Sequence, residues 1–152
     1  MSLQYTIHKA NINEAELIAP LFNEYRKFYQ QKDNIRLSAQ FLQARLSNSQ
    51  SIVFFAFDSI KKICCGFLQL YPSFSSVNAK SILILNDLFV DKNYRKQGIG
   101  KNLIINSHNF AIAQGYASVN LSTLADNHSA QKFYQNLGYK ENTQYINYKI
   151  NL

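Results

Sequence analysis

Residues 88–101 read LFVDKNYRKQGIGK, and this stretch carries most of the information about the fold. It runs from the end of an apolar strand-like segment through a short polar turn to Gly98 and Gly100, which open a helical pattern. The first N–H groups of a helix have no partner inside the helix, and the helix dipole adds positive charge there. Glycines allow close approach. The stretch therefore predicts an anion site suited to a pyrophosphate, with Arg95, Lys96 and Lys101 adding charge.

Two other phosphate-binding loops do not fit the sequence. There is no Gly-x-x-x-x-Gly-Lys-[Ser/Thr] motif, and the Gly-x-Gly-x-x-Gly fingerprint is incomplete because position 103 is Leu. On these residues alone one alternative stays open, in which Gly98 and Gly100 merely start a helix.

The remaining elements follow from hydrophobic periodicity and from turn residues. From about Asn13 to Tyr29 apolar residues recur at helical spacing, and Pro20 marks either the start of this helix or a kink. Ser38 is the predicted N-cap of a second, shorter helix. We expect strands at 4–9, 52–57, 63–71, 81–90, 119–124 and 145–150, a loop at 72–76, and helices at 98–113 and 127–137 that end at Gly115 and Gly138.

This order of elements predicts a fold of the α/β (α+β) class. Strand 81–90, helix 98–113 and the strand that follows form a βαβ unit, which should be parallel and right-handed. The chain has 152 residues, 47% hydrophobic and 16% charged. That length suits a single domain, residues 1–152, and that balance excludes disorder.

Cysteine usage and charge limit the compartment and the partners. Cys64 and Cys65 are adjacent, so on one strand they point to opposite faces, and we expect two reduced, buried residues of a cytoplasmic protein. There is no secretory segment and no apolar run long enough to cross a bilayer. The net charge of +7 is scattered along the chain, so neither a nucleic acid nor a membrane partner is expected. The histidines show no metal-binding spacing, so no metal is expected.

Two blocks of sequence resemble one family. Residues 95–100, RKQGIG, match the [Gln/Arg]-x-x-Gly-x-[Gly/Ala] signature of GNAT acetyltransferases. Residues 123–139, TLADNHSAQKFYQNLGY, resemble the family's Asn-x-x-Ala-x-x-[Leu/Phe]-Tyr-x-x-x-Gly-[Phe/Tyr] segment. The blocks stand in the family's order and at its spacing, and the resemblance covers residues 80–140.

The resemblance implies a mixed, mostly antiparallel sheet flanked by helices, with the fourth and fifth strands splayed apart. Acetyl-CoA would lie in the gap, where one strand N–H could polarise the thioester carbonyl. The cofactor-binding residues that it implies are Leu88, Phe89, Val90, Arg95, Lys96, Gln97, Gly98, Ile99, Gly100, Lys101, Asn127, Ala130 and Tyr134.

The resemblance also implies catalytic roles. Tyr134 matches the family's general acid for the departing thiolate, although a core tyrosine would give the same pattern. Asp87 could bind a substrate ammonium or relay a proton through water. The alternative is that backbone N–H groups satisfy the Asp87 carboxylate and it has no catalytic role. Relatives that acetylate polyamines often carry two neighbouring acids there, whereas this chain has Asn86 beside Asp87. Asn127 could contact the cofactor, cap a helix, or do both.

The acceptor site is expected near the first helices. Segments 25–29 and 69–76 resemble those of microbial members grouped with histone and polyamine acetyltransferases. Tyr25, Tyr29 and Tyr71 could offer aromatic faces to a cationic amine, and ordinary packing is the alternative for each. The expected reaction is direct acetyl transfer in a ternary complex to a primary amine, either a small polyamine-like molecule or a lysine side chain. A non-catalytic acyl-CoA sensor is the alternative, and a homodimer is common in the family.

Overall fold

The computed structural model describes residues 4–152, which form two compact units. The first unit extends to Ser122, and the second is Thr123–Leu152, which contains α4 (His128–Asn136). The prediction of a single domain stays a prediction. The elements of the first unit are β1 (Tyr5–Lys9), η1 (Ile12–Glu14), α1 (Ala15–Phe28), α2 (Ile35–Ser47), β2 (Ile52–Asp58), β3 (Ile63–Ser75), β4 (Lys80–Val90), η2 (Lys92–Tyr94), α3 (Ile99–Ala113) and β5 (Val119–Leu121).

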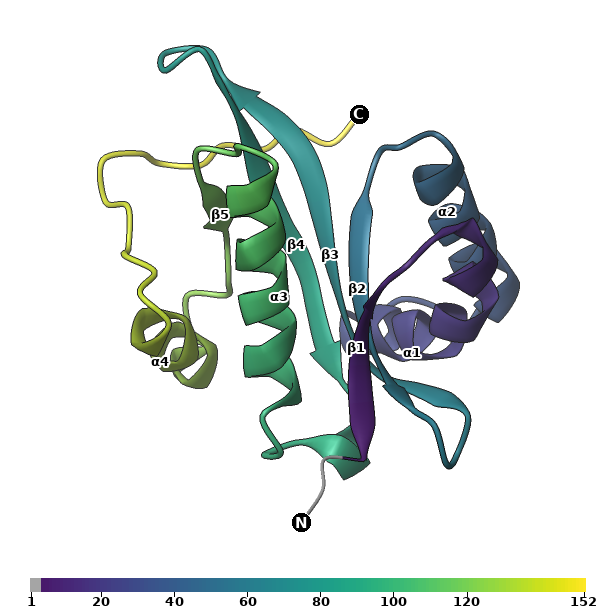
Figure 1. Ribbon diagram of the computed structural model, residues 1–152. Coiled ribbons are helices and arrows are strands. Elements are labelled where there is room, and N and C mark those ends of the chain that lie inside the picture. Colours follow the sequence, from purple (N-terminus) through teal and green to yellow (C-terminus); the bar gives the residue numbers. More distant parts are fainter. Residues whose placement is uncertain (1–3) are drawn as a thin grey trace. The chain divides into compact units, whose positions relative to one another are not determined.

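The first unit is a five-stranded sheet covered by helices on both faces. The strand order is β1-β2-β3-β4-β5, and every pair is antiparallel except β4 and β5, which are parallel. Helices α1 and α2 lie on one side of the sheet and α3 lies on the other (Figure 1). The expected mixed sheet and the parallel βαβ unit are both confirmed.

The core between α1 and the sheet follows from the helical spacing of the apolar residues. Ile18, Leu21 and Phe22 of α1 are buried together with Val53 and Phe55 of β2. Fully burying side chains of this size contributes about 1.5–3 kcal/mol each. This packing holds the last turns of α1 close to β3 and β4, where the candidate site forms.

Two helix starts differ from the predictions. Helix α1 begins at Ala15, so Pro20 lies inside the helix and does not start it. Helix α2 is capped by Asn34, whose side chain accepts a hydrogen bond from the Leu37 N–H at 2.9 Å. Ser38 is therefore not the N-cap: it is buried inside the helix, where its hydroxyl donates to the Asn34 carbonyl. Asn34 caps the helix because its side-chain amide oxygen accepts a hydrogen bond from an N–H group of the first turn.

Strand β3 extends to Ser75 and includes Pro72, whereas the sequence predicts a loop at 72–76. The last partner of β3 on the β2 side is Ile52, opposite Leu70, and beyond that point β3 pairs only with β4. A proline at such an edge removes no ladder hydrogen bond, so the strand continues through it.

Two strand predictions near the C-terminus need correction. Strand β5 ends at Leu121 and not at Leu124. Residues 145–150 form no strand, and the side chains of Tyr145, Ile146, Tyr148 and Ile150 are exposed. Their alternating pattern suits a strand, but an extended segment is stable only when another strand satisfies its backbone groups.

Several local predictions are confirmed. Gly115 and Gly138 follow α3 and α4 with φ of 77° and 93°, the left-handed conformation expected after a helix. Cys64 and Cys65 are free thiols and both are buried. No helix in residues 4–152 is long and apolar enough to cross a membrane.

Candidate active site

A one-residue bulge in β4 decides where Asp87 lies. Gln69 pairs with Asp87 and Leu70 pairs with Leu85, so Asn86 is an extra residue that has no partner on β3. Because side chains alternate along a strand, the extra residue moves Asp87 to the face opposite that of Leu85. Asp87 thereby lines a pocket beside α1.

Asp87 is buried, with 3% of its surface exposed, and two amide side chains hold its carboxylate. The Gln69 side-chain amide donates to one oxygen at 2.5 Å, and the Asn86 side-chain amide donates to the other at 2.9 Å. The Oε1 atom of Gln69 is itself buried and has no hydrogen-bond partner among residues 4–152. Polar side chains, and not backbone N–H groups, therefore orient the carboxylate.

The pocket that contains Asp87 has a volume of about 400 Å³, and half of its lining residues are aromatic. Tyr25 packs against Phe67 and Phe89 with ring centroids 5.7 and 5.9 Å apart, so its ring is fixed above the sheet. The structure brings together all four residues predicted to bind the acceptor: Tyr25, Tyr29, Tyr71 and Asp87. The other lining residues are Phe22, Arg26, Gln31, Leu37, Phe41 and Asn86.

Two tyrosines of the pocket, Tyr25 and Tyr71, are held in the neutral form. Burial raises the pKa of Tyr25 far above its usual range, and the charge of Asp87 adds to the rise. Burial also raises the pKa of Tyr71 to about 12, with a further rise from Asp87 and a smaller lowering from Arg45. Both phenols can therefore offer a neutral ring and a hydroxyl to a ligand at physiological pH.

The predicted anion loop lies between η2 and α3. Its backbone has positive φ at Lys96 (61°) and at Gly98 (81°), which is the N-cap of α3. A Cβ at Gly98 would come no closer than 3.9 Å to another residue, so the space beside it is open. Positive φ at alternate residues in front of a helix turns backbone N–H groups toward a common point, which suits an anion.

Side chains from distant parts of the chain fasten this loop. The Tyr94 hydroxyl donates to the buried Asp58 carboxylate at 2.6 Å and ties the loop to the β2–β3 turn. The Tyr5 hydroxyl accepts from the side chain of Asn102 at 2.7 Å and donates to the Gln97 carbonyl at 3.4 Å. The loop is thus held in shape by the protein itself.

The edge of β4 provides the predicted gap. Strand β5 pairs only with Leu83–Leu85, while β4 continues to Val90. Leu88, Phe89 and Val90 therefore lie where β4 has no strand on its β5 side within residues 4–152. The Val90 carbonyl accepts a hydrogen bond from Arg95 Nε at 3.0 Å. The other backbone groups of this edge suit a ligand with amide groups of its own.

Not every predicted cofactor residue can contribute its side chain. Ile99 is buried and packs against β3, where a Cβ on Gly66 would lie 2.7 Å from its Cγ2 atom. Only the backbone of Ile99 can therefore face the anion site. Arg95, Lys96, Gln97, Gly100 and Lys101 occupy the loop and the first turn of α3, as expected.

The remaining predicted residues lie in the second unit. The side chain of Asn127 caps α4 by accepting from the Ala130 N–H at 3.1 Å, which confirms its capping role. The ring of Tyr134 packs against Phe133 and Tyr139, with centroids 5.4 and 5.7 Å away. The cofactor and catalytic roles of Asn127, Ala130 and Tyr134 stay predictions.

Sequence reasoning missed Gln69 and Arg26. Gln69 left a signal, because it is a polar residue within the apolar run Phe67–Leu70 and a buried amide usually has a polar partner. The sequence gives no signal for Arg26, because a charged residue near the end of a helix is ordinarily exposed to solvent.

Comparison with known proteins agrees with this geometry. Residues 49–141 match the Acetyltransferase (GNAT) domain family. An uncharacterised N-acetyltransferase of Bacillus subtilis, YhfO, is 40% identical over 146 residues, which cover 96% of this chain and 97% of that one. A probable acetyltransferase of Haemophilus influenzae is 32% identical over 68% of this chain and 70% of its own length. The crystal structure of a probable acetyltransferase superposes with a TM-score of 0.89 at 34% identity, covering 97% of both chains.

The mixed sheet with its open β4 edge, the anion loop and these matches together define the class of protein. The chain belongs to the GNAT family and is an acetyltransferase.

Proposed function

We propose that this protein transfers the acetyl group of acetyl-CoA to a primary amine that binds as an ammonium ion beside Asp87. The observation that carries the proposal is the buried Asp87 carboxylate in an aromatic pocket, next to the edge of β4 that lacks a strand partner. Tyrosine faces and a carboxylate are a favourable environment for an ammonium group. Both the amine of a small polyamine-like molecule and a lysine side chain present that group.

The residues present fit acetyl-CoA. The open backbone at Gly98 and the start of α3 would hold the pyrophosphate, with Arg95, Lys96 and Lys101 nearby. The edge Leu88–Val90 would bond the amides of the pantetheine arm. Acetyl-CoA supplies the activated acyl group, as a thioester.

The chemistry requires two protons to leave the ammonium nitrogen and one to reach sulfur, with the other released to solvent. Asp87 would accept the ammonium proton, directly or through water, and free the lone pair of the nitrogen. That nitrogen then attacks the carbonyl carbon and an N–C bond forms. The nitrogen would lose its second proton to water as the C–S bond breaks. A backbone N–H of β4 would stabilise the developing oxyanion. Tyr134 would give its phenolic proton to the thiolate and recover one from solvent.

A covalent intermediate on cysteine finds no support in the structure. Burial raises the pKa of the Cys64 thiol to about 12 and that of the Cys65 thiol to about 11. Thiols in this state carry little of the reactive thiolate. Transfer would therefore occur directly between the two bound substrates.

The test is release of free thiol from acetyl-CoA with a panel of polyamines, amino acids, aminoglycosides and lysine peptides, alongside calorimetric binding of acetyl-CoA. We expect release that depends on the acceptor. Asp87→Asn should raise KM for cationic acceptors roughly tenfold to a hundredfold, because the ammonium loses a charged hydrogen-bond partner.

Glu16→Gln is the matched control, since it removes an exposed carboxylate from the far end of α1. Its kinetics should equal those of the wild type. Tight binding of acetyl-CoA without release for any acceptor would contradict the proposal and favour a sensor. An equal effect of Asp87→Asn on neutral amines would contradict the role of Asp87.

A further inference from the structure

The acceptor pocket is lined by a positively charged side chain as well as by the carboxylate of Asp87. Arg26 of α1 lines the same pocket as the β4 residues Asn86 and Asp87. Arg45 of α2 does not itself line the pocket. Its guanidinium lies 4.9 Å from the centre of the ring of Phe41, which does. Its charge reaches the pocket, since it lowers the pKa of Tyr71 against the larger effect of burial.

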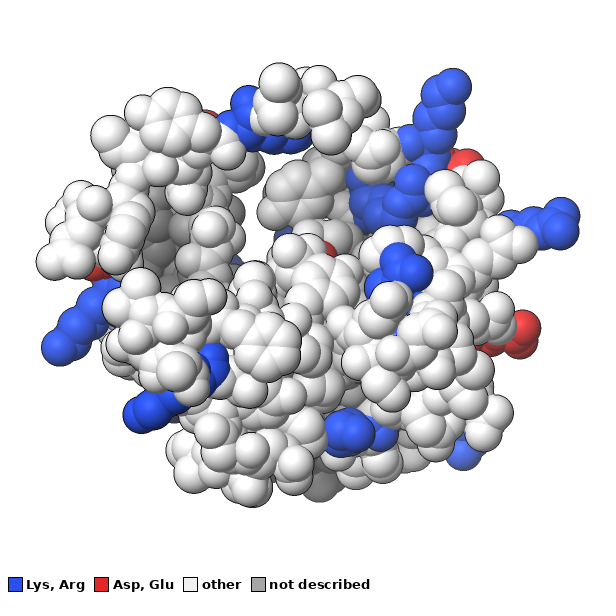
Figure 2. Space-filling model, turned by 90° about the horizontal axis from the view of Figure 1, so that it is seen from above, with Lys and Arg blue, Asp and Glu red and all other residues white. Residues whose placement is uncertain are grey.

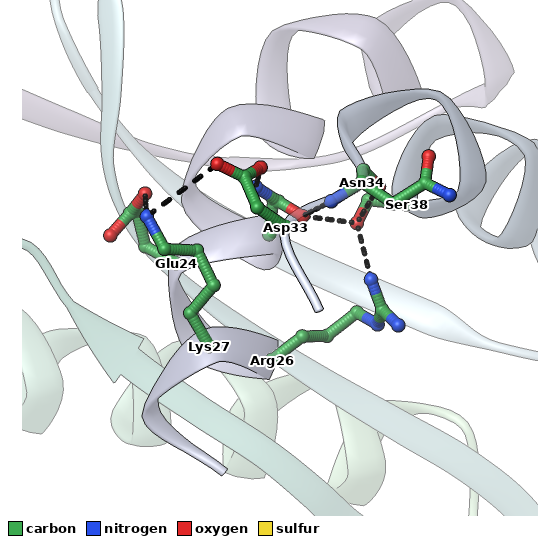
Figure 3. A network of polar contacts seen from close by, with 7 residues as sticks. Glu24, Arg26, Lys27, Asp33, Asn34 and Ser38 are labelled. Carbon is green, nitrogen blue, oxygen red and sulfur yellow. Dashed lines mark hydrogen bonds and ion pairs between the residues drawn. The ribbon is translucent and has the colours of Figure 1, made fainter. Parts of the chain in front are cut away.

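Within residues 4–152, neither Arg26 nor Arg45 has a carboxylate partner. The ion pairs found within residues 4–152 join Lys27 to Glu24 at 2.8 Å and to Asp33 at 3.9 Å. Figure 3 shows the side chains of Lys27 and Arg26 diverging, with Lys27 directed to Glu24 and Asp33 and Arg26 directed to Ser38. The acids near the end of α1 therefore compensate Lys27 and not Arg26.

The hydrogen bonds of the two guanidinium groups are also incomplete. Arg26 is partly buried, and the single hydrogen bond of its guanidinium to residues 4–152 is a long one, from Nη1 to the Ser38 hydroxyl at 3.4 Å. The Nε atom of Arg45 is buried and has no partner in the same range. A guanidinium carries five N–H donors, so Arg26 keeps donors for an acceptor. Burial of Arg45 Nε without an acceptor is unfavourable.

A polar network holds Arg26 in this position. The Asn23 side chain is buried and accepts from the Asn34 N–H at 3.0 Å, while its amide donates to Asp33 at 2.7 Å. The Ser38 hydroxyl lies 3.3 Å from the same Asn23 oxygen (Figure 3). The network ties the end of α1 to the start of α2, so the buried Ser38 is held in place and with it Arg26, which lines the pocket.

The pocket is lined by the Asp87 carboxylate and by the Arg26 guanidinium, which has no carboxylate partner within residues 4–152. Together they complement a molecule that carries both charges. A polyamine carries only positive charges, and an ammonium near Arg26 or Arg45 would be repelled. We propose that the acceptor is a free amino acid, and that Arg26 binds its carboxylate while the reacting amine lies beside Asp87. This inference rests on the proposed function and narrows its acceptor class.

The test compares amino acids with the amines that remain when their carboxylate is removed. The pairs are ornithine with 1,4-diaminobutane, lysine with 1,5-diaminopentane, leucine with 3-methylbutylamine, and phenylalanine with 2-phenylethylamine. The amides of the same four amino acids remove the charge while nearly keeping the size. The measured quantity is kcat/KM by thiol release from acetyl-CoA, with each acceptor in turn.

We expect the best acceptor to be an amino acid, preferred about tenfold or more over both its amine and its amide, as loss of a charged hydrogen bond predicts. Arg26→Gln should reduce that preference about tenfold by raising KM for the amino acid, and Arg26→Lys should restore part of it. Arg36→Gln is the matched control, because Arg36 is an exposed arginine of α2 that does not line the pocket. Thermal unfolding of each variant verifies folding.

The outcomes separate the two proposals. Turnover confined to amines or amides without a carboxylate would overturn the inference and leave the acetyltransferase function intact. An amino-acid preference that Arg26→Gln leaves unchanged in a folded variant would also overturn it. Failure to acetylate any amine in either panel would overturn the proposed function itself, and the inference with it.

Discussion

Gly98 and Gly115 have the same backbone requirement in different surroundings. Both have φ near 80°, one in front of α3 and the other behind it. Neither is crowded, since a Cβ would meet nothing closer than 3.9 Å at Gly98 and nothing within 4 Å at Gly115. The difference lies in the helix ends, because the first exposes N–H groups and the second exposes carbonyl groups.

Gly98→Glu is expected to abolish acetyl-CoA binding, because it places a carboxylate where the pyrophosphate would bind. Gly115→Glu imposes the same left-handed strain of about 1–2 kcal/mol without touching that site. The two variants should therefore unfold at similar temperatures and differ in affinity, which calorimetry measures. Normal affinity in Gly98→Glu would contradict the assignment of the loop.

Tyr134→Phe tests the predicted general acid. We expect kcat to fall about a hundredfold, within the range for loss of a general acid, with little change in the affinity for acetyl-CoA. Phe133→Leu is the control, because it changes a neighbouring ring of α4 and removes no hydroxyl. If kcat is unchanged in Tyr134→Phe, the tyrosine is a packing residue.

At the scale of elements, the contact between β3 and α3 positions the anion loop. Gly66 lies under the first turn of α3, where an added Cβ would come within 2.7 Å of Ile99 Cγ2 and 3.4 Å of Leu103 Cδ1. Ile99 is fully buried, so it cannot move aside freely. Only glycine lets the start of α3 come this close to the sheet.

Gly66→Ala should destabilise the protein by about 1–3 kcal/mol, the usual effect of overpacking. It should also weaken acetyl-CoA binding, because it displaces the first turn of α3. In the double variant Gly66→Ala, Ile99→Ala the clash is gone. That variant should therefore be more stable than the sum of the single changes predicts. Denaturant unfolding and calorimetry measure the two effects. Strict additivity would contradict the close contact.

At the scale of the whole molecule, charge is spread over the surface. The net charge is +7, and on the face in Figure 2 most lysine and arginine side chains are separated by uncharged surface, while several adjoin at the upper right. The cytoplasmic location, the homodimer and the absence of a nucleic-acid partner remain predictions.

The buried pair of Tyr94 and Asp58 should make stability depend on pH at both extremes. The hydrogen bond from Tyr94 lowers the pKa of Asp58, so its stabilising effect is present above the unfolded pKa of about 3.9 and lost as pH falls through the folded value. Burial, reinforced by Asp58, raises the pKa of Tyr94 to about 12. That contribution is complete below the unfolded pKa of about 10 and lost as pH rises toward 12.

The measurement is urea unfolding between pH 8 and pH 11. We expect the free energy of unfolding to fall above pH 10 in the wild type and to fall less steeply in Tyr94→Phe. Tyr148→Phe is the control, since the side chain of Tyr148 is 91% exposed. Equal slopes for the wild type and Tyr94→Phe would contradict a buried, neutral Tyr94.

Most of the fold and the anion loop could be predicted from sequence because their signals are local. Helical spacing, the glycines after α3 and α4, and the run Arg95–Gly100 lie within short stretches, so neighbouring residues specify them. Residues 145–150 had an equally clear local pattern and formed no strand, because a strand also needs a partner. Alternation along the chain cannot show whether a partner exists.

The family, the order of the elements as far as α4 and the position of the anion loop follow from the sequence alone. The acceptor pocket depends on the tertiary structure. The bulge at Asn86 turns Asp87 toward α1, the register places Gln69 opposite it, and Arg26 comes from a helix some sixty positions earlier in the chain. A shift of one residue in a strand moves every side chain beyond it to the other face. Which groups meet in the pocket therefore depends on strand pairing, which no local pattern specifies.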